Sequence, residues 1–198
     1  MKKTLLCVFM TFAGLYISNA QSEDSGVEFG IKAGANISST VGSKFRDSQK
    51  DRVAFNAGIV SEFHLSEKFS LQPELMYSGQ GSQVVRTDAQ DVELKLDYIQ
   101  LPVLAKFYFV KDFSSIELGP QVGYKIKEDL SVDGIASDDR VRDLDLSLAL
   151  GFTYEFKNGI FISARYNHGM IDILDETYLL GAVYKKNTVI QVDLGFMF

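Results

Sequence analysis

Residues 188–198, TVIQVDLGFMF, constrain the fold more than any other stretch of the chain. One face is wholly apolar and carries Ile190, Val192, Leu194, Phe196 and Phe198, whereas the alternate positions include Gln191, Asp193 and Gly195. A period of two residues is that of a β-strand. Strands at chain ends fray in water, so an aromatic residue in the final position needs an apolar environment to be ordered. A closed membrane barrel provides one, because its last strand pairs with its first and lipid covers the outward face.

The amino end predicts export. Met1, Lys2 and Lys3 form a basic start, residues 5–16 form an apolar run, and Ser18-Asn19-Ala20 resembles a cleavage site. We therefore predict a signal peptide over residues 1–20 and a barrel domain over residues 21–198. The apolar run is too short for a membrane anchor. Cys7 lies inside the run and not after it, which disfavours a lipoprotein signal.

Charge and cysteine content exclude several classes of protein. Removal of residues 1–20 leaves 18 basic and 26 acidic residues, a formal charge of −8, and no cysteine. Disulfides and thiolate metal sites are then impossible, and an acidic chain without a basic stripe is not expected to bind nucleic acid. No later segment has the roughly 20 uninterrupted apolar residues of a membrane helix. Any crossing of a membrane must therefore use strands.

Alternation of apolar with polar or small residues predicts eight strands. They cover residues 27–38, 53–64, 69–78, 94–109, 115–126, 143–156, 160–169 and 188–198. The connections are alternately long and short, and one short turn contains Asn158-Gly159, a pair that favours tight hairpins. Outer-membrane barrels have an even number of strands, long external loops and short periplasmic turns. The sequence thus predicts an all-β, eight-stranded antiparallel up-and-down transmembrane β-barrel in the cell outer membrane.

A soluble eight-stranded lipid carrier is the alternative fold. Such a barrel places its apolar face inward and its charges outward. Here the charged faces also carry Gly30, Gly34, Gly119 and Gly123, which suit a crowded interior, while the opposite faces carry Phe, Tyr and Leu side chains too bulky for one. The pattern therefore favours the membrane barrel.

The charged face places many ionisable residues in the lumen. They are Glu28, Lys32, Glu62, Glu74, Lys106, Glu117, Lys125, Asp145, Glu155, Arg165 and Asp193. The interior of an eight-stranded barrel is just wide enough for side chains, and burying an unpaired charge is costly. We therefore expect the three lysines and Arg165 each to contact at least one acid. The expected role is a structural plug, and a narrow conducting pore is the alternative.

Catalytic and metal sites have little support in the sequence. His64 and His168 are expected at opposite rims, and neither lies near a convincing nucleophile. His168 with Asp172 or Asp175 resembles the acid–base pair of an outer-leaflet hydrolase or acyltransferase, and this is the alternative to a solvated loop. The acidic loop residues do not match the spacing of a calcium loop; these are Asp129, Asp133, Asp138 and Asp139. We expect no enzyme, no cofactor and no metal.

Three prolines, Pro73, Pro102 and Pro120, fall inside three consecutive strands. Proline has no N–H to donate, and a closed barrel has no free edge at which that loss is harmless. We therefore expect a bulge or a gap in the ladder at these strands.

Several motifs together resemble the PorT-type outer-membrane β-barrel family of gram-negative bacteria. They are GIKAGANIS at 30–38, LQPELMYSGQG at 71–81, DYIQLPVLAKFYF at 97–109, LGPQVGY at 118–124 and SARYNHG at 163–169. The resemblance implies outer-membrane location, and some members are accessories of a secretion and gliding system. We expect a monomer in contact with outer-membrane lipid and inserted by the barrel-assembly machinery. Its long loops would offer surfaces to a protein or ligand that the sequence does not identify.

Overall fold

The computed structural model describes residues 26–41, 49–84, 92–110, 113–132, 135–136, 142–171 and 186–198. The predicted signal peptide lies outside these residues. The described residues form strands β1 (Val27–Val41), β2 (Gln49–Ser66), β3 (Phe69–Val84), β4 (Val92–Val110), β5 (Ser114–Val132), β6 (Ile135–Ala136), β7 (Leu144–Glu155), β8 (Ile160–Gly169) and β9 (Lys186–Met197). None of the described residues belongs to a helix that is long and apolar enough to span a membrane.

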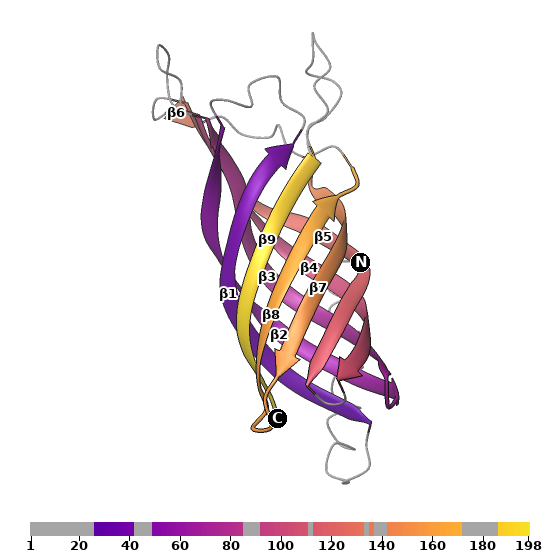
Figure 1. Ribbon diagram of the computed structural model, residues 1–198. Coiled ribbons are helices and arrows are strands. Elements are labelled where there is room, and N and C mark those ends of the chain that lie inside the picture. Colours follow the sequence, from indigo (N-terminus) through magenta and orange to yellow (C-terminus); the bar gives the residue numbers. More distant parts are fainter. Residues whose placement is uncertain are drawn as a thin grey trace, which may run out of the picture.

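Eight long strands close into an antiparallel barrel (Figure 1). Each long strand pairs with its sequence neighbours, β4 with β5 included, and β6 pairs only with the end of β5. The last strand closes the ring by pairing with the first, continuously from Gly30↔Met197 to Val41↔Lys186. The predicted eight-stranded up-and-down barrel is confirmed.

The barrel is apolar outside and polar inside. Leu150 on β7 is 52% exposed and Leu194 on β9 is 60% exposed, whereas Lys32, Glu74 and Arg165 are buried in the lumen. This alternation is the reverse of a soluble carrier, whose apolar side chains line the interior. An exposed apolar surface of this extent requires lipid to cover it.

A charged side chain on the outward apolar surface is expected to lower the stability of the membrane-inserted barrel. Leu150 lies midway along β7 and faces outward, so Leu150→Arg places a charge near the middle of the bilayer. We expect a loss of about 2–4 kcal/mol in the free energy of folding into lipid vesicles. Urea titration of the vesicle-inserted protein measures this loss, and Lys127→Arg outside the apolar band is the matched control. Equal stability of the two variants would contradict the lipid-facing assignment.

Several strands are longer than their predicted ranges, mainly on the side of the long loops. β2 begins at Gln49, β3 continues to Val84 and β5 continues to Val132, so parts of the predicted loops are strand. A strand of about 9–11 residues already crosses the bilayer. Beyond the bilayer, neighbouring strands still pair through backbone hydrogen bonds, but their outward side chains need not be apolar. The alternation of apolar and polar residues therefore ends before the strand does. The short β6 strand was not predicted.

The three prolines coincide with gaps in three consecutive ladders. Pairing stops and resumes with the same register on both sides, so these are gaps and not bulges. The interrupted stretches are residues 61–62 with 72–73, 74–75 with 101–102, and 103–104 with 119–120. The predicted disturbance is confirmed, and its cause is the N–H group that each proline lacks.

Gly119, next to Pro120, allows a close approach of β5 to β4. A Cβ at this position would lie 2.0 Å from the carbonyl oxygen of Val103 and 2.9 Å from Cα of Leu104. Both are backbone atoms, which cannot move aside as the end of a side chain can. Glycine is therefore required where the two strands pass each other.

Candidate functional site

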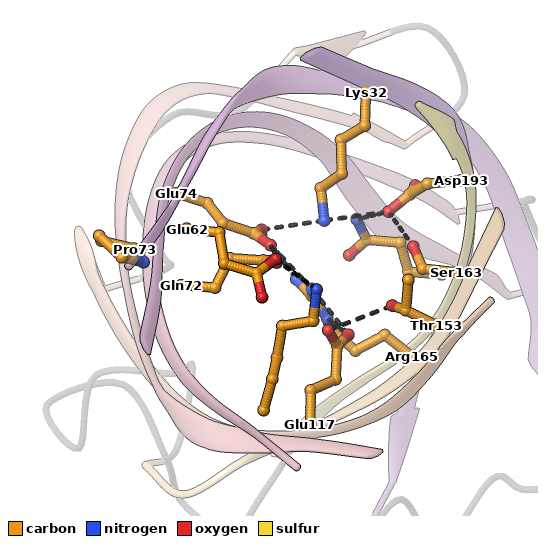
Figure 2. Close-up of polar contacts among 12 residues, drawn as sticks. Lys32, Glu62, Gln72, Pro73, Glu74, Glu117, Thr153, Ser163, Arg165 and Asp193 are labelled. Atoms are coloured by element: carbon orange, nitrogen blue, oxygen red, sulfur yellow. Dashed lines mark hydrogen bonds and ion pairs between the residues drawn. The ribbon is translucent and has the colours of Figure 1, made fainter. Parts of the chain in front are cut away.

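The centre of the lumen contains an ion-pair core (Figure 2). Arg165 of β8 spans the lumen and donates two hydrogen bonds of 2.9 Å to the two carboxylate oxygens of Glu74 on β3. Its Nε donates to Glu117 of β5 at 2.9 Å, and its Nη2 lies 2.8 Å from the same carboxylate. All three side chains are at most 1% exposed. The fork of one guanidinium thus neutralises two buried acids, which is the geometry in which arginine pairs most strongly.

Lys32 extends this core to the strands that close the barrel. Its Nζ on β1 lies 2.9 Å from Glu74 and 3.2 Å from Asp193 of β9. Asp193 also accepts a hydrogen bond of 2.8 Å from Gln191. The core of Lys32, Glu74, Glu117, Arg165 and Asp193 therefore joins strands from all around the wall.

A second cluster lies toward the short turns. Glu62 of β2 accepts hydrogen bonds from Lys106 at 2.6 Å, from Tyr108 and from Ser70. At the rim beside this cluster, His64 lies 3.6 Å from Glu28, and both side chains are more than a third exposed. These contacts occupy the short-turn half of the lumen around one fully buried carboxylate.

The remaining predicted lumen residues lie toward the two rims. Lys125 pairs with Glu128 at 2.6 Å and with Asp143 at 3.4 Å near the long-loop side. Asp145 is buried, and Glu155 is half-buried; neither forms an ion pair with a described residue. All predicted lumen residues other than Glu28 and Glu155 are buried. Each of the four predicted cations contacts at least one acid.

A layer of neutral amides and hydroxyls covers the charged core on the long-loop side. Asn36 donates to Ser78 at 2.8 Å and to the carbonyl of Gly79 at 2.9 Å, and Asn56 donates to Asn36 at 2.9 Å. Asn187 donates to Gln80 in the same layer. Gln80 and Asn187 lie in stretches predicted as loops. Their place in the lumen would follow only if the alternation of inward and outward residues were continued past the predicted ends of the two strands.

Apolar side chains also fill part of the lumen beside the predicted charge network. Val60, Phe161 and Met197 form a buried cluster. The space bordered by Lys32, Lys106, Glu155 and Phe161 does not admit a water molecule. At this level, side chains leave no room for water in the lumen.

The two histidines do not form a joint site. His64 lies on β2 at the short-turn rim of the barrel. His168 lies near the long-loop end of β8, where it is exposed and stacks on Tyr166, with ring centroids 6.2 Å apart. Asp172 and Asp175, which had been considered as partners of His168, lie outside the described residues, as do Asp133, Asp138 and Asp139.

The described residues contain no group of three or more His, Cys, Asp or Glu side chains able to hold a metal. Asp129 lies on the part of β5 that extends past the apolar band. There Lys127 donates to Asp129 at 2.8 Å and lowers the pKa of that carboxyl. The Lys127 and Asp129 side chains are 62% and 49% exposed, so the pair marks a solvated surface.

The fold, the lipid-covered exterior and the packed polar interior together define a small outer-membrane β-barrel protein. No curated protein sequence matches the chain. Residues 19–175 match the model of the outer membrane protein beta-barrel domain family, and the chain belongs to this family. Membership implies location in the outer membrane.

Solved structures with the same fold include two other bacterial proteins. Neisserial surface protein A has a TM-score of 0.57 at 14% identity, covering 87% of this chain and 99% of that chain. Ail, the attachment invasion locus protein of Yersinia pestis, has a TM-score of 0.54 at 15% identity, covering 86% and 98%. Ail in complex with the heparin analogue sucrose octasulfate has a TM-score of 0.54 at 17% identity, covering 87% and 99%. At these identities the likeness concerns the fold alone.

Proposed function

We propose that the protein is a closed, non-conducting outer-membrane barrel that acts through its external surface, in a structural or surface-interaction role. The observation that carries this proposal is the filled lumen. The Arg165 core, the amide layer above it and the Glu62 cluster below it place hydrogen-bonded side chains at three successive levels of the lumen, and the space bordered by Lys32, Lys106 and Phe161 does not admit a water molecule. The same contacts disfavour the narrow-pore alternative, since opening it would separate buried ion pairs.

The external side offers an ordered surface for interaction. β2 to β5 have 16 to 19 residues each, whereas β7 to β9 have 10 to 12, so one side of the wall projects beyond the other. Its outer part exposes both signs of charge, including Lys95, Lys127 and Asp129. A mixed-charge wall suits a protein partner with complementary charges. The resemblance to PorT-type barrels adds the finer proposal that this partner belongs to a secretion system.

Conductance across planar bilayers tests whether the lumen is closed. We expect the wild-type protein to give no current steps above those of the bare bilayer. A variant that shortens side chains at all three levels, with Asn36→Ala in the amide layer, Glu62→Ala in the lower cluster and Glu74→Ala, Glu117→Ala and Arg165→Ala in the core, is expected to conduct, which shows that inserted barrels are detected. Current steps from the wild type would overturn the closed-barrel proposal and favour the pore.

Site-specific photo-crosslinking in whole cells tests the surface role. A photoreactive residue at Asp129 on the projecting wall is expected to capture a partner. The same residue at Glu67, in the short turn between β2 and β3, is the matched control for the opposite end of the barrel. Crosslinks from Glu67 alone would place the interaction in the periplasm and contradict an external surface role.

A further inference from the structure

Two carboxylates lie opposite each other where β1 begins and β2 ends, at the short-turn mouth of the lumen. Glu28 of β1 and Glu62 of β2 are direct register partners in the ladder that joins these strands. Like charges directly opposite each other on neighbouring strands weaken the pairing. Lys106 already pairs with the buried Glu62 at 2.6 Å, whereas the Glu28 side chain is 44% exposed. The uncompensated negative charge therefore lies on the Glu28 side.

The imidazole of His64 lies between these two carboxylates. Its Nε2 is 3.6 Å from Oε2 of Glu28, and its Nδ1 is 3.9 Å from Oε1 of Glu62. A neutral imidazole has one N–H and one lone pair, so it can favour only one of the two acids and turns its lone pair toward the other. A protonated imidazole has an N–H on both nitrogens. The arrangement therefore suits the charged form of His64 better than the neutral form.

The other ionisable groups around His64 come from β4 and β7. Lys106 and Tyr108 of β4 both donate to Glu62, and the Tyr108 ring lies 6.4 Å from the imidazole between centroids. Lys106 disfavours a proton on His64, while the negative charge of Glu155 on β7 favours one. The hydrogen bond with Glu28, at the exposed rim, has the larger effect and raises the pKa of His64 above its ordinary value of about 6.5.

We propose that Glu28, Glu62 and His64 form a pH-dependent switch at the rim, which holds the open ends of β1 and β2 together when His64 is protonated. Loss of the proton leaves the two carboxylates to repel each other. Solvent supplies the proton, because the imidazole is 36% exposed. The backbone N–H of His64 also donates to the carbonyl of Gly26 at 2.7 Å, so this residue secures the start of β1. Outer-membrane barrels have short turns in the periplasm, so the rim switch would respond to periplasmic pH.

Urea unfolding of the detergent-folded protein over a range of pH, at constant ionic strength, tests the rim switch. A histidine whose pKa is raised in the folded state gives its full stabilisation below about pH 6.5, the unfolded value, and loses it as the pH rises through the folded value. We therefore expect His64 to make the unfolding equilibrium constant rise above about pH 6.5, by up to about tenfold per pH unit, the limit for one proton. The readout is the fraction of the fast-migrating folded band on unheated gels.

The contribution of His64 is the difference between the pH profiles of the wild type and His64→Gln. The variant is expected to lose part or all of the rise above about pH 6.5. His168→Gln changes the other histidine of the chain, at the opposite rim, and is the matched control that keeps the wild-type profile. The same difference is expected in a Glu155→Gln background, in which the nearby acid of β7 no longer titrates. Identical profiles for the wild type and His64→Gln would overturn the proposal.

An NMR titration tests the contact with Glu28 directly. The chain has two histidines, so the imidazole signal that disappears in His64→Gln identifies this residue. Glu28→Gln leaves His64 in place but removes the exposed carboxylate, and it is expected to move the titration of the His64 signal to lower pH. A His64 titration that is the same in the wild type and in Glu28→Gln would show that the two side chains do not interact, which contradicts the rim switch.

Discussion

Replacing Arg165 with methionine is expected to lower the free energy of unfolding by about 3–5 kcal/mol, because the change leaves Glu74 and Glu117 buried with much of their countercharge gone. Both carboxylates are at most 1% exposed and both take hydrogen bonds from this one guanidinium. Lys32 remains near Glu74 but is shared with Asp193, and Glu117 forms no other ion pair with a described residue. Urea unfolding of vesicle-inserted protein measures the loss.

A triple variant distinguishes lost charge pairing from lost packing. Arg165→Met combined with Glu74→Gln and Glu117→Gln removes the uncompensated charges while keeping the side-chain volumes close to the original. Replacing a whole buried ion-pair group by neutral residues is often tolerated. The triple variant is therefore expected to regain most of the stability that Arg165→Met alone loses. If it is no more stable than the single variant, packing and not charge explains the loss.

Gly119→Ala is expected to destabilise the barrel by about 3 kcal/mol, the upper part of the range for overpacked sites. The added methyl group would meet the Val103 carbonyl and Cα of Leu104, both on the backbone of β4. The β4–β5 ladder is already interrupted here, so it has few hydrogen bonds with which to resist separation of the strands.

Gly123→Ala on the same strand is the matched control for that prediction. Its methyl group would make only ordinary contacts, at 3.4 to 3.5 Å. This variant is expected to lose less than about 1 kcal/mol. Similar losses for Gly119→Ala and Gly123→Ala would show that glycine is needed along β5 for a reason other than close strand approach.

The sequence predicted the membrane-crossing part of the fold because lipid requires an alternation that is visible in the residues. The predicted range of β8 agrees with the structure at both ends, and β8 lies wholly within the alternating pattern. The last residues of β5, from Lys127 to Val132, show no such alternation and were predicted as loop. Their pairing with β4 depends on backbone hydrogen bonds, which any sequence without proline provides.

The lumen residues were predictable from the same alternation, but their partners were not. Glu74 and Arg165 come from β3 and β8, which are not neighbours in the barrel, so their contact depends on the stagger of the strands. Alternation gives the face of a residue but not its height in the lumen. For the same reason the sequence did not separate Asp145, which forms no ion pair with a described residue, from the acids of the core.

The positions of the gaps in strand pairing determine where the barrel wall would open under force. The seam between β1 and β9, where the two ends of the chain meet, is fully paired, and the interrupted ladders lie between β2 and β5 on the opposite side of the ring. A ring under tension opens where the fewest bonds hold it. Mechanical widening of this barrel would therefore begin along the line of prolines, and the joint between the first and last strands would be among the last to part.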